Sequence, residues 1–229
     1  MLMILSAGIA PGFALLCYFY LRDQFEPEPI LAVIKAFIYG AVITFPIMFM
    51  QYVLTTEHLL PGNVQNAFIQ SSLLEEFFKW FILFFITFQN EEFTEPFDGI
   101  VYGVSVSLGF ATVENILYLF ANGVGLAFGR AFMPVSSHAL FGVIMGYYLG
   151  KARFSSKHRL SLIILSFIIP YMLHGFYDYI MLTQHRWIYY MIPFMLGLWW
   201  LALKKVKQAH LLSAQHLKQQ SVHQNQTYF

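Results

Sequence analysis

The sequence predicts an all-α membrane protein, a polytopic helix bundle with about seven transmembrane helices. Of the 229 residues, 58% are hydrophobic and only 11% are charged, and the mean hydropathy is +0.60. A soluble globular domain has roughly 25% charged residues. Seven apolar segments also approach the length of about 20 residues that a helix needs to cross a bilayer core about 30 Å thick.

The expected spans follow one another with short connections. They run Leu2–Leu21, Ile30–Leu54, Ala67–Phe88, Gly99–Phe120, Ala131–Gly150, Leu160–Leu182 and Trp187–Leu203. The first is expected to be a retained helix, because it lacks a basic n-region and no small-residue cleavage site follows it. Residues 1–203 are therefore expected to form a single transmembrane domain, followed by a short cytoplasmic basic and polar tail over residues 204–229.

The distribution of basic residues predicts the orientation, since cytoplasmic loops carry an excess of Lys and Arg. With the N-terminus outside and the C-terminus inside, only Arg130 and Arg186 face the outer side. The cytoplasmic side then receives Arg22, Lys35, Lys151, Arg153, Lys157, Arg159, Lys204, Lys205, Lys207 and Lys218.

Composition also excludes several functional classes. The formal charge of +1 gives no signal for binding a polyanion, so no nucleic-acid partner is expected and the lipid bilayer is the expected surrounding. Cys17 is the only cysteine, which excludes an internal disulfide and a thiolate metal site.

Ionisable residues occur inside the expected spans, where each charge costs about 2.5–3.5 kcal/mol on insertion scales and therefore suggests a functional site. They are Glu75, Glu76 and Lys79 in the third span, Glu114 in the fourth, His138 in the fifth, and His174 with Asp178 in the sixth. At 1.5 Å per residue, the carboxylates and imidazoles other than Asp178 are expected about 9–14 Å below the outer surface. Asp178 is expected nearer that surface.

This layer of side chains has the chemistry of a hydrolytic site. Imidazole nitrogens and carboxylate oxygens are zinc ligands. Glu114, His138, His174 and Asp178 are accordingly the candidate ligands for a divalent metal such as zinc. Glu75 or Glu76 is then the candidate general base, and His174 the third catalytic candidate. Lys79 lies three and four residues from the paired glutamates and would support them as a buried ion pair. A metal-free, glutamate-dependent hydrolase remains open.

Other hydrolase types do not fit. There is no H-E-x-x-H helix and no G-x-S-x-G elbow. Only Asp178 lies within a span at the right place for an aspartyl intramembrane protease, which would need two such aspartates.

The joint order of motifs resembles one known family. E-E-x-x-K at Glu75–Lys79, F-x-x-x-E at Phe110–Glu114, the Ser137-His138 pair and H-x-x-x-D at His174–Asp178 resemble the PrsW family, across most of the chain. That family is related to the CAAX-processing and bacteriocin-immunity membrane proteases, whose pattern has E-E-x-x-x-R, F-x-x-x-H and H-x-x-x-N. Here Lys79 comes one residue earlier than that Arg, and Glu114 and Asp178 replace His and Asn.

The resemblance implies an intramembrane protease in the cytoplasmic membrane of a bacterium. Its substrate would be a single-pass membrane protein, the RsiW anti-sigma factor. The implied reaction is the site-1 cut under envelope stress, which starts the regulated degradation of RsiW and leads to release of the sigma factor. The domain over residues 1–203 would then be catalytic.

Two alternatives use the same residues. Intramembrane carboxylates and histidines also build cation or proton transporters, but no internal repeat is visible and the polar layer does not continue to the cytoplasmic side. A prenyl-peptide-processing enzyme would open toward the cytoplasm, whereas this layer faces outward. The loops Thr55–Asn66 and Ala121–Arg130 are candidate substrate or signal-sensing surfaces. Gly142, Gly146 and Gly150 are expected to form a face for close helix packing.

Overall fold

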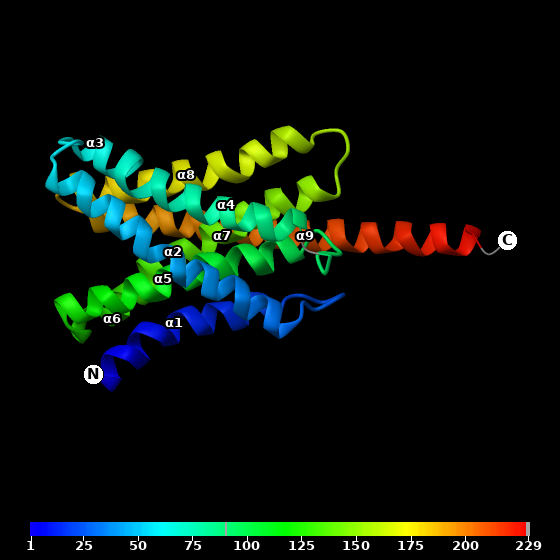
Figure 1. Ribbon diagram of the computed structural model, residues 1–229, viewed down its shortest axis with the longest axis horizontal. Coiled ribbons are helices and arrows are strands. Elements are labelled where there is room, and N and C mark those ends of the chain that lie inside the picture. The colour runs from blue at the N-terminus through cyan, green and yellow to red at the C-terminus, as the bar shows by residue number, and fades with distance from the viewer. Residues whose placement is uncertain (90, 228–229) are drawn as a thin grey trace.

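In the computed structural model, which describes residues 1–89 and 91–227, the chain is helical and the described residues form no strand. The long helices run side by side along the longest axis of the molecule (Figure 1). They are α1 (Leu2–Tyr20), α2 (Ile30–Thr56), α4 (Leu74–Gln89), α5 (Asp98–Asn122), α7 (Ser136–Arg153), α8 (Arg159–Thr183) and α9 (Trp187–Thr227). The predicted all-α bundle is confirmed.

Five of the seven expected spans are confirmed as helices long and apolar enough to cross a membrane. They are Leu2–Tyr20, Ile30–Thr56, Asp98–Asn122, Val124–Arg153 and Arg159–Thr183. Large apolar side chains such as Phe49, Leu160 and Leu196 stand on the outside of the bundle, as lipid-facing residues do. The chain is a multi-pass membrane protein.

The third and seventh expected spans have a different form. Residues 66–73 form the π-helix η1 (Asn66–Leu73), so α4 itself has only 16 residues. The seventh expected span is the first part of α9, which continues without a break past Leu203 and leaves the bundle at the C-terminal end (Figure 1). Residues of the expected tail pack inside the structure, including Val206, Ala209 and Ser213. The division at residue 203, the total number of spans and their orientation stay predictions.

The segment expected as an outer loop over Ala121–Arg130 is largely helical. The 3-10 turn η2 (Val124–Leu126), α6 (Ala127–Arg130) and the π-helix η3 (Ala131–Val135) connect α5 to α7. One extra residue per turn shifts the angular position of every residue that follows, and π segments often occur at functional sites. Both η1 and η3 lie directly before helices whose first turns contain ionisable residues, Glu75 and Glu76 in α4 and His138 in α7.

Helix α5 is the centre of the bundle. Every residue from Asp98 to Thr112 is buried, with α1, α2 and α7 around it. Its contact with α7 depends on glycine: a Cβ on Gly146 would lie 1.9 Å from the carbonyl oxygen of Gly99, and a Cβ on Gly103 would lie 2.4 Å from that of Gly142. The predicted small-residue face on α7 therefore allows close approach of two backbones.

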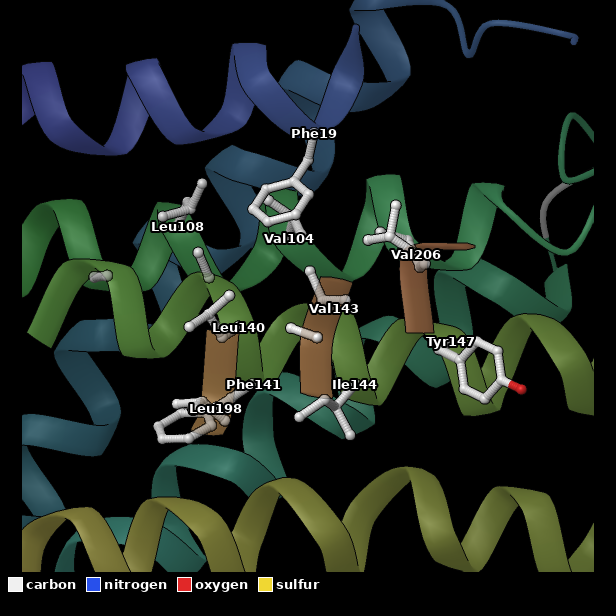
Figure 2. Close-up of a cluster of buried hydrophobic side chains, with 14 of the residues drawn as sticks. Phe19, Val104, Leu108, Leu140, Phe141, Val143, Ile144, Tyr147, Leu198 and Val206 are labelled. Atoms are coloured by element: carbon white, nitrogen blue, oxygen red, sulfur yellow. The ribbon is translucent and has the colours of Figure 1, made fainter. Parts of the chain in front are cut away.

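The hydrophobic core lies between α1, α5, α7 and α9. In Figure 2, Phe19 of α1 points toward Val104 of α5, and Val143 and Ile144 of α7 lie beside α9. Leu198 and Val206 supply the α9 side of this core. These contacts hold α5 and α7 in a fixed relation, which matters because both carry ionisable residues of the predicted site.

Candidate active site

The structure brings the predicted site residues together from four helices. Glu75 and Glu76 lie in the first turn of α4, and His138 in the first turn of α7. Glu114 comes from α5, and His174 comes from α8. One ligand atom from each of Glu75, Glu76, His138 and His174 lies within 4.8 Å of the others, and all four side chains are buried.

Lys79 joins the two glutamates. Its Nζ atom, with no exposed surface, lies 2.8 Å from Glu76 Oε1 and 3.4 Å from Glu75 Oε2. The ammonium also lies 4.1 Å from the centre of the Phe110 ring, a cation–π contact. A buried charge is tolerated only when it is paired. The contacts with Lys79 therefore explain how two glutamates can be buried in the protein interior. The expected supporting contact of Lys79 is present.

The two histidines differ in the hydrogen bonds that they make. Lys79 Nζ lies 3.1 Å from His138 Nδ1, and an ammonium group can only donate. His138 therefore carries its proton on Nε2 and donates it to Glu114 Oε2, 3.2 Å away. In contrast, His174 donates from Nδ1 to Glu76 Oε1 over 2.9 Å, which leaves the lone pair on Nε2.

The free nitrogen of His174 faces carboxylates. His174 Nε2 is 3.4 Å from Asp178 Oδ2 and 4.0 Å from Glu75 Oε2. A lone pair beside two carboxylate oxygens is stable only when a proton or a metal ion lies between them. This corner of the site is therefore the place where a cation would be held.

Further polar side chains hold the carboxylates in place. Gln51 Nε2 donates to Glu75 Oε1 at 3.1 Å, and Ser71 Oγ donates to Asp178 Oδ2 at 2.5 Å. Sequence reasoning missed both contacts, although Gln51 stands out as a polar residue in an apolar run.

Arg130 was also missed as a site residue. Sequence reasoning placed it as an outer-side orientation signal and as the last residue of a candidate surface loop, but its guanidinium lies 3.1 Å from Glu114 Oε1 and 3.9 Å from the centre of the Tyr118 ring. Its Nε atom also donates to Asn115 Oδ1 at 2.8 Å. Because α6 and η3 are helical, Arg130 reaches back toward α5.

These side chains border a cavity of about 650 Å³. Its lining includes Gln51, Ser71, Glu75, Glu114, Arg130, His138, His174 and Asp178. Glu76 and Lys79 lie behind this layer, so they contact the lining side chains and not the cavity. Residues of the expected Thr55–Asn66 surface, among them His58 and Pro61, form the rim.

A membrane-spanning helix bundle with buried glutamates and histidines on a polar cavity has the fold and site of an intramembrane hydrolase. The family model described as "PrsW family intramembrane metalloprotease" matches residues 28–201. The chain belongs to this family, and it is a membrane peptidase.

Curated relatives agree with this assignment. The chain is 56% identical to Protease PrsW of Geobacillus kaustophilus, with 91% of this chain and 93% of the relative covered. It is also 56% identical to Protease PrsW of Bacillus subtilis (91% and 96% covered) and 32% identical to that of Clostridioides difficile (82% and 83% covered). No solved structure matches the chain.

The family description implies a metal ion, and the residues present fit one. A catalytic zinc site uses three protein ligands of nitrogen and oxygen type. His174 Nε2 and Asp178 Oδ2 are two such atoms, and Glu76 on Nδ1 orients the imidazole as second-shell carboxylates do. His138 Nε2 also faces this point, because it lies 3.9 Å from Glu75 Oε2. To ligate a metal, His138 would have to carry its proton on Nδ1 in place of Nε2, and Lys79 would then lose its hydrogen bond to Nδ1.

Glu114 fits the predicted ligand set less well. Its two oxygens are taken by Arg130 and His138, and it is absent from the group of mutually close ligand atoms. The ligand assignments among Glu114, His138, His174 and Asp178 remain a proposal.

Proposed function

We propose that this chain makes the site-1 cut in a single-pass, membrane-anchored anti-sigma factor of the RsiW type, which starts its regulated degradation and releases the sigma factor. Membership of the family supports proteolysis, and the resemblance supports this substrate class. The observation that carries the proposal is the His174 nitrogen facing Glu75 and Asp178 at the wall of a polar cavity.

Glu75 is the proposed general base. It lines the cavity, Gln51 and Ser71 contact its Oε1 atom, and its Oε2 atom faces both histidines. In this position it takes a proton from the attacking water and returns it to the leaving amine. The base must stay ionised at rest, and the ion pair with Lys79 favours that state.

Glu76 is proposed as a positioning residue. It is fully buried, accepts the Nδ1 proton of His174, and pairs with Lys79. It thereby sets the tautomer and the ring orientation of His174 without touching the substrate. Phe141 adds to this, because its ring stacks on His174 with centroids 5.1 Å apart.

Charge that develops on the scissile carbonyl needs a stabilising group. Among the donors that border the cavity, Arg130 is proposed to supply this stabilisation, and so is the Nε2 proton of His138 when no metal is bound. A divalent metal held by His174, Asp178 and the other tautomer of His138 would instead supply Lewis-acid stabilisation and would lower the pKa of a water molecule at the site.

One experiment separates the metallo and glutamic types. The wild type and a His138→Ala/His174→Ala double variant are purified, and bound metal and cleavage of a membrane-anchored substrate are measured before and after chelation. We expect bound metal and chelator-sensitive cleavage in the wild type, and neither in the double variant. Full-rate cleavage by metal-free wild type would contradict the metallo type and leave Glu75 as the only water activator.

The orientation is tested separately. Reporter fusions after Asn63 and Asn122 are expected to be outside, and fusions after Ser155 and Gln208 inside, as the distribution of basic residues predicts. A cytoplasmic signal after Asn122 would contradict an outward-facing site and favour the prenyl-processing alternative.

A further inference from the structure

A second group of buried carboxylates lies at the opposite end of the bundle, where α9 leaves it. We call Asp23, Glu28, Glu95 and Asp98 the acidic cluster. Asp23 follows α1, Glu28 precedes α2, Glu95 precedes α5, and Asp98 is the first residue of α5. Each has at most 7% of its surface exposed. One carboxylate oxygen from each of Asp23, Glu95 and Asp98 lies within 4.8 Å of the others.

Many oxygens of this cluster have no hydrogen-bond partner. Glu95 is fully buried, and neither of its carboxylate oxygens has a donor in good hydrogen-bond geometry, although the Asp23 carboxyl and the Ser213 hydroxyl lie close to it. One oxygen each of Asp23, Glu28 and Asp98 is also unpartnered, which makes five in one place. A buried polar group without a partner costs about 1–3 kcal/mol, and an ionised one costs more. This many orphan oxygens on facing carboxylates indicates a ligand that they share.

The remaining oxygens shape the cluster. Asp98 Oδ2 accepts the backbone N–H groups of Thr94 and Glu95 at 2.7 and 2.8 Å, and Asp23 Oδ2 accepts that of Glu28 at 3.3 Å. The hydroxyl of Tyr102 donates to Glu28 Oε2. These bonds hold one oxygen of each of three carboxylates and leave the other oxygen free for a ligand.

No lysine or arginine pairs with the cluster within the part of the chain that the structure describes, and His210 is the group whose positive charge would act on it, at Asp23. None of its four carboxylates forms an ion pair with a described lysine, arginine or histidine. The neighbouring His210 stacks on Phe97, and its Nε2 atom donates to the carbonyl oxygen of Arg22. Burial raises the pKa of Asp23, that of Glu28 to about 7 and that of Glu95 to about 8. The five unpartnered oxygens of the cluster have no bonded donor and no ion-paired cation among the described residues.

We propose that the acidic cluster is a second cation site, which binds a hard divalent cation such as Ca²⁺ or Mg²⁺ through carboxylate oxygens. All of its side-chain ligands are oxygens, as Ca²⁺ and Mg²⁺ prefer. It contains no thiolate and no free imidazole, which zinc and copper would favour.

A bound cation would join two segments that are distant in sequence. Asp23 and Glu28 belong to the connection between α1 and α2, whereas Glu95 precedes α5 and Asp98 is its first residue. Phe97 N donates to Ser213 Oγ over 3.0 Å and so ties the same place to α9. This site is independent of the proposed proteolysis, because Asp98 and Glu114 are sixteen residues apart on α5, about 24 Å along the helix.

The test uses the full chain in detergent, with the candidate active site disabled by the double substitution Glu75→Gln/His174→Ala. The protein is treated with a chelator, and the chelator is then removed. Binding of Ca²⁺ and Mg²⁺ is measured by equilibrium dialysis, and thermal unfolding is followed with each ion. The cluster is then altered by Glu95→Gln, and separately by Asp98→Asn. Glu26→Gln is the matched control, since Glu26 is an exposed carboxylate beside the cluster that bonds only Thr94 Oγ1 in the described structure.

We expect about one ion bound per chain and a rise in Tm of about 5 °C or more at a hundredfold excess over Kd, in the background and in the Glu26→Gln control. Either cluster substitution should abolish both effects. Undiminished binding in Glu95→Gln and Asp98→Asn would overturn the proposal. So would a background chain that binds neither ion while the substitutions raise Tm, because protons would then neutralise the cluster.

Discussion

The two buried groups of ionisable residues in this protein differ in how their charges are balanced. At the proposed peptidase site, Lys79 contacts Glu75 and Glu76, and Arg130 pairs with Glu114. In the acidic cluster, Asp23, Glu28, Glu95 and Asp98 face one another without an ion pair to a described residue. Burial of carboxylates is common to both, so burial alone does not define their chemistry.

The comparison shows what internal charge balance makes possible. A carboxylate with a fixed cationic partner stays ionised without an added ligand and is ready to accept a proton from water. A carboxylate group without such a partner must take up a proton or a cation. The first region is therefore suited to catalysis, and the second to ligand binding.

The largest expected effect distinguishes the two regions by activity. Glu75→Gln and His174→Ala should each lower cleavage of a membrane-anchored substrate by about 10²–10⁴-fold, because each removes a group at the cavity wall that we propose acts on the reacting atoms. Protein abundance should stay near that of the wild type. The control Glu26→Gln should cleave normally; retained cleavage in both site variants would remove the catalytic assignment.

The next effect concerns the lysine that balances the peptidase site. Lys79→Met should lower the free energy of unfolding by about 3–5 kcal/mol, because it leaves Glu75 and Glu76 buried without their cation. Thermal unfolding in detergent measures this loss. Adding Glu76→Gln to Lys79→Met should restore part of the stability, whereas an unchanged Tm in the single variant would mean that the ion pair does not support the fold.

Without divalent cations, the acidic cluster should make stability depend on pH. The folded-state pKa of Glu28 is raised from 4.5 to about 7 and that of Glu95 to about 8, mainly by burial. The folded protein then holds protons that the unfolded chain has lost, so stability falls as pH rises from about 4.5 to about 8. Below about pH 4.5 this contribution is fully present.

Unfolding scans with chelator between pH 5 and pH 8.5 measure this decline. Saturating Ca²⁺ or Mg²⁺ should flatten this decline, because the bound cation compensates the carboxylates. Glu95→Gln should also flatten it, because it removes one of the carboxyl groups that titrate. A Tm that rises over this range in the chelated wild type would contradict the assignment of uncompensated carboxylates.

The smallest expected effect is at the rim of the peptidase site. Arg130→Gln should change the free energy of unfolding by no more than about 1 kcal/mol, since ion pairs near a surface contribute little. Here the Glu114 side chain is 31% exposed, unlike Glu76 at 0%. Thermal unfolding of Arg130→Gln in detergent is compared with that of Lys79→Met. A loss as large as that of Lys79→Met would show that Arg130 balances a charge as deeply buried as Glu76.

Much of the architecture was predictable from local sequence. Apolar segment length identified five confirmed spans, and glycine spacing identified the α7 packing face. Intramembrane charge identified Glu75, Glu76, His138 and His174, which the structure joins. These properties are local because the cost of placing each residue in lipid depends on that residue and its near neighbours along one helix.

The pairing between helices could not be predicted in this way. The contact of Lys79 with His138, the reach of Arg130 to Glu114 and the support of Glu75 by Gln51 depend on how each helix is rotated, and η1 and η3 shift that rotation. The acidic cluster is the clearest case. Glu95 lies between two expected spans, where no functional residue was predicted, and only tertiary packing brings it beside Asp23, 72 positions earlier in the sequence. The sequence alone determined which groups would be costly to bury, whereas the tertiary structure decided which of them received a partner, because electrostatic compensation acts between atoms a few ångströms apart.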